Sequence, residues 1–143
     1  MRVRGTWLAA VGLVAALALP ARAAPDEPEM PRIQRRIPDH PPSVFDGCRS
    51  QDLVRIRQMI TRAIQRGAPT YNSGDFRGCY AIYERAARQI EQVLPAACAG
   101  PARALADGRQ TAATRSTDAE RAWAMRDAFD GLLRALSRYG RGR

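Results

Sequence analysis

Three segments of the chain repeat one spacing of apolar residues, at offsets 0, 3, 7, 10, 11 and 14. This spacing lies on one face of an α-helix, and no stretch shows the alternation expected of a strand. We therefore predict three amphipathic helices that bury their apolar stripes against one another in an all-α fold. The stripes are Leu53, Ile56, Ile60, Ala63, Ile64 and Gly67; Phe76, Cys79, Tyr83, Ala86, Ala87 and Ile90; and Ala122, Met125, Phe129, Leu132, Leu133 and Leu136.

A fourth helix is predicted between the second and third stripes. Pro101 suits the first turn of a short helix that ends at about Asp107 or a little beyond, with Leu105 and alanines as its apolar face and Gly108 weakening it. Thr117 and Glu120 have the spacing of a capping box, which predicts the start of the last helix. Residues 46–140 are thus expected to form a small four-helix bundle.

The first two helices are predicted to form an antiparallel hairpin. Ser73-Gly74-Asp75 reads as a tight turn between them, and small residues occupy the positions where the two helices touch. Pro69 is expected to interrupt the first helix.

The hairpin resembles a tetratricopeptide repeat over about residues 63–94. The match consists of Gly67, then Gly74-Asp75-Phe76, then Cys79, Tyr83 and Ala86. In that family these positions supply a glycine in the first helix, the turn, and the small and aromatic residues of the second helix. The resemblance implies a surface that binds peptides.

This sequence departs from the repeat pattern in three ways. Ala63 stands near the place of an early large aromatic, the closing proline is displaced to Pro95, and no second copy follows. Stacked repeats need about three copies for stability. We therefore expect a single tetratricopeptide-like hairpin inside a bundle.

The first 23 residues have the pattern of an export signal. Arg2 and Arg4 precede the uncharged run 7–19, and a small-residue cleavage motif ends at Ala23. The run is shorter than the roughly 20 apolar residues of a spanning helix, although an uncleaved anchor is the alternative. We expect a mature protein of 120 residues that is periplasmic or secreted.

Residues 24–45 contain six prolines, which block helix and central strand alike. We expect a disordered, extended arm between the signal and the bundle. Its other features are Arg32, Arg35, Arg36 and His40.

Three cysteines flank and enter the hairpin. Cys48 precedes the first helix and Cys98 follows the second, so antiparallel packing brings them together. In an oxidising compartment we predict a Cys48–Cys98 disulfide, with Cys79 a buried free thiol in the seam. The competing pairings are Cys48–Cys79 and Cys79–Cys98.

The net charge of +9 rests on arginine alone, because the chain has no lysine. Arginine suits phosphate and carboxylate recognition, but scattered arginines are typical of a solvated surface. Nucleic acid is an unfavoured partner because aromatic residues are not interleaved with these arginines. A cluster at the C-terminus favours the helix dipole and weak contact with anionic envelope polymers; it comprises Arg134, Arg138, Arg141 and Arg143.

No catalytic, metal or cofactor pattern stands out. The cysteines lack CxxC or CxxCH spacing, and the one histidine, His40, lies in the arm. Two carboxylate pairs, Asp127 with Asp130 and Glu84 with Glu91, are flanked by arginines at helical spacing and are interpreted as surface ion pairs. We expect neither an enzyme nor a bound cofactor.

One candidate partner surface lies around the turn and consists of Tyr71, Asn72, Tyr80 and Tyr83. Exposed aromatics beside an amide are typical of binding patches, although tyrosines at these positions more often seal a hairpin. The leading hypothesis is a non-enzymatic helical module for protein or peptide interaction in the cell envelope. The alternative is a bundle that binds a small ligand or cofactor at an internal site lined by Met59, Met125 or Trp123.

Overall fold

The computed structural model describes residues 31–141. Over this range the chain forms four α-helices and two short 3₁₀ helices, with no strand, so the predicted all-α fold is confirmed for this part. The α-helices are α1 (Ser50–Asn72), α2 (Phe76–Val93), α3 (Ala99–Ala113) and α4 (Asp118–Arg141); the 3₁₀ helices are η1 (Pro42–Phe45) and η2 (Ala96–Cys98). The predicted signal (1–23), the start of the arm (24–30) and Arg143 lie outside the described residues.

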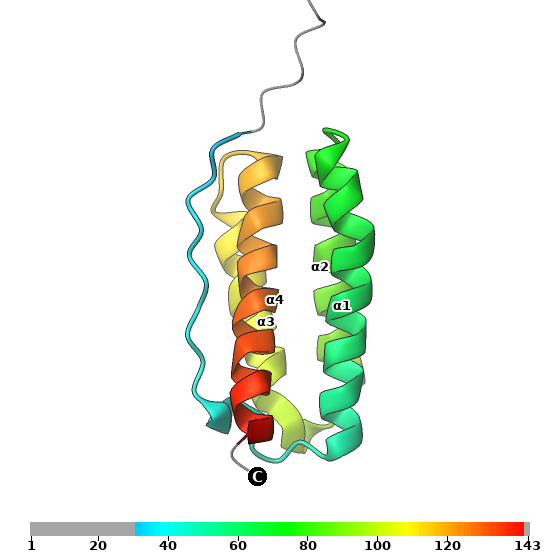
Figure 1. Cartoon of the computed structure of the whole chain (residues 1–143), viewed down its shortest axis with the longest axis vertical. Coiled ribbons are helices and arrows are strands. Elements are labelled where there is room, and N and C mark those ends of the chain that lie inside the picture. The colour runs from blue at the N-terminus through cyan, green and yellow to red at the C-terminus, as the bar shows by residue number, and fades with distance from the viewer. Residues whose placement is uncertain (1–30, 142–143) are drawn as a thin grey trace, which may run out of the picture.

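The helices form two antiparallel pairs, α1 with α2 and α3 with α4 (Figure 1). The middle of the bundle is α2, which packs against both α3 and α4, while α1 packs mainly against α2. The predicted stripes meet in the core, where Ile60, Ile90, Phe129 and Leu132 are almost fully buried. Burying one such side chain contributes about 1.5–3 kcal/mol, so this shared core accounts for the packing of the pairs.

The α1–α2 turn has the chemistry that its sequence predicts. Gly74 has φ +88°, a left-handed conformation that glycine adopts without strain. Asp75 caps α2 by accepting a hydrogen bond from the Gly78 N–H at 2.8 Å. Along the seam, a Cβ on Gly67 would overlap the Tyr83 ring, so the missing side chain sets the close approach of the two helices.

Two helix boundaries differ from prediction. Pro69 does not interrupt α1, which continues to Asn72; the lost hydrogen bond and the crowding by the proline ring fall in the last turn, where α1 ends three residues later. The third helix extends to Ala113 rather than to about Asp107. Gly108 lies inside it, where an added Cβ would come 2.5 Å from the Cβ of Ala128 on α4. The close α3–α4 packing at that point offsets the low helix propensity of glycine.

The predicted disulfide joins Cys48 and Cys98, with their Cα atoms 4.4 Å apart, and Cys79 is a buried free thiol. The bond lies beside η1, where Phe45 is fully buried and its ring centroid is 5.7 Å from that of Tyr139. The bundle therefore includes Phe45, one residue before its predicted start at residue 46.

The described part of the proline-rich arm is not the disordered spacer that we expected. Residues 31–41 are extended as predicted, but they run along the outer side of the α3–α4 pair for much of its length (Figure 1). Ile33 packs against the core cluster, and the side chains of Arg35 and Arg138 join the segment to α4. We call residues 31–41 the docked arm.

Candidate functional site

The four residues of the predicted partner surface do not form one exposed patch. Tyr71 and Tyr83 are buried, with 7% and 3% of their surface exposed, Tyr80 is half-buried, and Asn72 is exposed. The Tyr71 ring packs against Phe76 at 4.6 Å between centroids. These aromatics seal the hairpin and its contact with α4, as the simpler interpretation of the sequence suggested.

Burial also governs the titration of the groups in this seam. It raises the pKa of the Cys79 thiol, although a hydrogen bond with Tyr83 opposes the shift. Burial, with Cys79 beside it, raises the pKa of Tyr83 to about 12. Both groups are therefore neutral at pH 7, and Cys79 behaves as a small apolar residue rather than as a nucleophilic thiolate.

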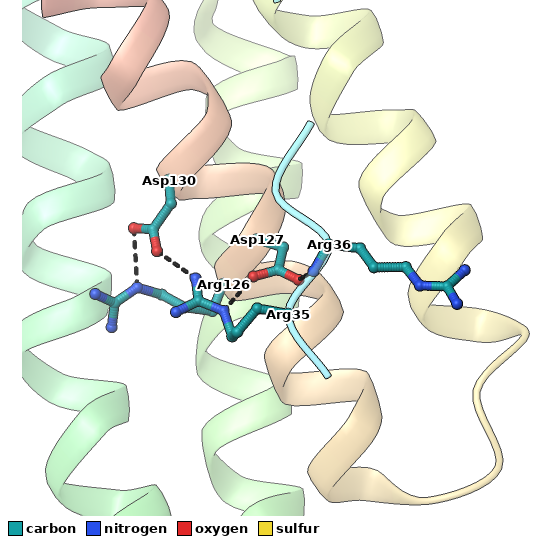
Figure 2. A network of polar contacts seen from close by, with 5 residues as sticks. All are labelled: Arg35, Arg36, Arg126, Asp127 and Asp130. Atoms are coloured by element: carbon teal, nitrogen blue, oxygen red, sulfur yellow. Dashed lines mark hydrogen bonds and ion pairs between the residues drawn. The ribbon is translucent and has the colours of Figure 1, made fainter. Parts of the chain in front are cut away.

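A different set of residues meets where the docked arm crosses α4 (Figure 2). The Arg35 guanidinium donates from Nε to Oδ1 of Asp127 and from Nη2 to Oδ2 of Asp130, the latter at 2.6 Å. Its Cζ atom also lies 4.5 Å from the ring centroid of Trp123. We call Asp127, Asp130 and Trp123 the clamp.

The clamp binds the main chain of the arm as well as a side chain. The backbone N–H of Arg36 donates to Oδ2 of Asp127 at 2.6 Å. One buried carboxylate thus contacts both the arginine side chain and the next peptide group. Figure 2 shows the Arg36 side chain pointing away from the acidic pair, toward α3. Burial lowers the pKa of Arg35, but its hydrogen bonds with the two aspartates outweigh that effect and raise it overall.

A second contact fixes the other end of the docked arm. Arg138 of α4 donates to Oδ1 of Asp39 at 2.8 Å and to the backbone oxygen of His40 at 2.6 Å. The arm passes close to α4 here, since a Cβ on Gly131 would come 2.7 Å from the Pro38 oxygen. Arg138 is thus engaged within the molecule, while Arg134 and Arg141 are exposed on the same helix.

The docked arm does not fill the face on which it lies. A groove of about 540 Å³, which we call the arm groove, lies between the arm and helices α3 and α4. Ala104, Gly108 and Ala124 contribute to its helical wall, and Arg36 and His40 contribute from the arm. The Nε2 atom of His40 is buried there without a hydrogen-bond partner, and burial lowers the pKa of this imidazole.

The carboxylates pair within their own helix only in part, and Glu91 of α2 pairs with Arg109 of α3 at 2.8 Å. Asp130 does pair with Arg126 one turn earlier, at 3.0 Å, and Glu84 pairs with Arg88. Asp127, however, is only 6% exposed and pairs with the arm rather than with its own helix. A signal for this was present: Ala124, Ala128, Gly131 and Ala135 form a second stripe of small residues, which indicates a second packed face on α4 around Asp127.

The three residues that were proposed to line an internal ligand site do not lie together. Met125 is fully buried in the core, Met59 lines a shallow groove between α1 and α2, and Trp123 lines the arm groove. Within residues 31–141, no three His, Cys, Asp or Glu side chains are grouped closely enough to hold a metal ion.

No protein-family model, curated protein or solved structure matches the chain.

Proposed function

We propose that this chain is an exported, non-enzymatic helical module that binds a protein or peptide partner in the cell envelope. One observation carries the proposal: an extended segment lies on the α3–α4 face, where the clamp holds an arginine side chain and a backbone amide together. Side-chain and main-chain contacts of this kind are how proteins recognise extended peptides.

Three features support a binding rather than a catalytic role. The two carboxylates of the clamp are both engaged by Arg35, the Cys79 thiol is buried with a raised pKa, and His40 lies against the bundle with a buried Nε2 atom. None of the described helices is long and apolar enough to cross a membrane. The export signal at residues 1–23 supports a periplasmic or secreted location.

The tetratricopeptide-like hairpin remains part of the proposal as a scaffold. Its close seam at Gly67 and Tyr83 gives α4 a firm support, and the partner binds on the opposite pair of helices. Arg134, Arg141 and Arg143 add weak attraction for anionic envelope polymers, whereas nucleic acid is not a proposed partner.

Site-specific photocrosslinking in the native envelope tests the proposal. A photoreactive amino acid replaces Thr111, which lines the arm groove, and in a matched variant it replaces Gln58, which is exposed on α1. We expect protein adducts from position 111 that are absent at position 58. Equal labelling at both positions, or none at either, would contradict a binding role for this face.

A small-ligand site is the second candidate, because the arm groove falls within the range of roughly 300–1,000 Å³ typical of ligand pockets. Protein purified from its native host would then carry a visible chromophore or a stoichiometric small molecule, measured by absorption and by native mass spectrometry. A colourless protein of the mass of the chain alone favours the peptide-binding role.

A further inference from the structure

The docked arm is held by few contacts for a segment of its length. Among the described residues, no main-chain hydrogen bond joins residues 31–41 to an α-helix, and the Pro41 oxygen accepts one only from the Val44 N–H of the adjoining η1. The arm is joined to α4 through the side chains of Arg35 and Arg138 and the Arg36 amide, and most of its residues are exposed. Segments with few buried contacts and solvent-exposed bonds open most readily, so the arm is the displaceable element of this fold.

The clamp has the geometry of an arginine site rather than of a general cation site. Asp127 and Asp130 accept from two different nitrogens of one guanidinium, and the Trp123 ring lies against its face. Only a planar guanidinium satisfies both carboxylates and stacks on the ring at once, whereas a lysine ammonium is a single point charge. The N–H of the next residue donates to Asp127 as well, which the extended backbone of the arm at Arg35 allows.

The arm fills this site incompletely. Beside the clamp, the arm groove of about 540 Å³ is walled by small side chains of α3 and α4, including Ala104, Gly108 and Ala124. Gln34 and Arg36 are the arm residues that flank Arg35 along it. A segment with the same arginine and a bulky apolar residue at the position of Gln34 would keep the clamp contacts and bury additional apolar surface.

We propose that the clamp and the arm groove are a recognition site for an extended, arginine-bearing segment of a partner protein, and that residues 31–41 occupy it as a placeholder. This inference rests on the proposed function and specifies the partner. The tether gives the arm a high effective concentration, of millimolar order for a short flexible link. A partner therefore displaces it only by adding contacts, which the unfilled arm groove offers.

Peptide titration of the expected mature chain, residues 24–143, tests the inference. Arg35→Ala frees the clamp without altering it, and Trp123 is the only tryptophan of residues 24–143, so that its fluorescence reports binding. The probe is a synthetic peptide with the sequence of residues 31–41. We expect it to bind the Arg35→Ala chain at least about tenfold more tightly than the chain with Arg35, whose clamp is occupied. Far-UV circular dichroism verifies that the variant retains its helices.

Two altered peptides define the specificity. Replacing Arg35 of the peptide by Lys should weaken binding at least about tenfold, because one carboxylate and the ring lose their partner. Replacing Gln34 of the peptide by Phe should strengthen it several-fold by filling the arm groove. Equal affinity of the Arg and Lys peptides would overturn the inference, as would unchanged binding to a chain that also carries Asp127→Asn and Asp130→Asn.

Displacement in the chain with an unaltered arm is a second, independent measurement. The backbone amide of Arg36 in the chain donates to Asp127, so it should exchange its hydrogen slowly while the arm is docked. A saturating concentration of the Gln34→Phe peptide should speed this exchange, which NMR measures. Dimerisation with that amide still protected would identify the arm of a second copy as the occupant and overturn the inference. If the peptide binds equally well without its arginine and position 111 still gives adducts, the inference is rejected but the proposed function is not. If the peptide does not bind and position 111 gives no adducts, the proposed function is rejected as well.

Discussion

The α1–α2 seam and the contact between the docked arm and α4 both join two segments side by side, but different forces hold them. The seam is apolar and closed: Gly67 admits the Tyr83 ring, whose centroid lies 5.5 Å from that of Phe129. The arm contact is ionic and open, with Arg35 at 36% side-chain exposure beside an unfilled groove.

This difference assigns the two regions different tasks. Dispersion and burial at the close contact between Gly67 and Tyr83 hold the fold together. Partly exposed ion pairs contribute little to stability, yet they select strongly for charge and geometry. Binding elements are drawn from the less stable parts of a fold, which agrees with the proposal that a partner binds where the docked arm lies.

The largest expected effect comes from removing the bond that closes the hairpin. The double variant Cys48→Ala, Cys98→Ala opens a loop of 50 residues, which by the chain-entropy model lowers the free energy of unfolding by about 4 kcal/mol. Urea denaturation followed by circular dichroism measures it. Cys79→Ala is the matched control and should cost far less, so equal losses in the two variants would show that the disulfide contributes no particular stability.

Overpacking the seam should have the next largest effect. Gly67→Ala forces the Tyr83 ring to move within a packed core, and we expect a loss of about 1–3 kcal/mol in the free energy of unfolding. Gly140→Ala on α4 is the control, because no atom beyond the neighbouring backbone of α4 lies within 4 Å of its added Cβ and alanine favours the helix. If both variants are equally stable, the close approach at Gly67 does not limit the seam.

The features that the sequence predicted lie in the α1–α2 hairpin, whereas the contact between the docked arm and α4 was not predicted. Helical periodicity and turn residues are local signals, so they locate the apolar stripes, the turn at Gly74 and the helix ends that place Cys48 beside Cys98. The Arg35–Asp127 pair joins residues 92 positions apart. No local pattern specifies which of the many arginines pairs with which carboxylate, and a proline-rich segment with little apolar content has the composition of disorder whether or not it docks.

Disrupting the clamp should lower the free energy of unfolding less than the two changes above, but it should release the docked arm. Asp127→Asn removes a charge that is 6% exposed, and with the partial exposure of Arg35 we expect a loss of about 1 kcal/mol. Trypsin cleavage after Arg35 and Arg36 should become faster as the arm is released. Asp46→Asn is the control, since Asp46 is exposed and lies outside the docked arm. Identical cleavage rates in both variants would mean that Asp127 does not hold the arm.

The smallest expected effect is a pH dependence at the far end of the docked arm. Burial lowers the pKa of His40, Arg138 acts in the same direction, and Asp107 and Asp39 oppose them. The unfolded chain therefore takes up this proton first as the pH falls below about 6.5, and the folded state loses stability from that pH down to the folded pKa of His40. His40 is the one histidine in the chain. Hydrogen bonds from Arg49 and from Thr117 lower the pKa values of Asp52 and Glu120, so these two carboxyl groups titrate below this pH range. The free energy of unfolding should thus fall between pH 7.5 and pH 5.5 in the unsubstituted chain and stay flat in His40→Gln. If the free energy of unfolding still falls with pH in His40→Gln, another group takes up the proton and the docked arm does not cause the pH dependence.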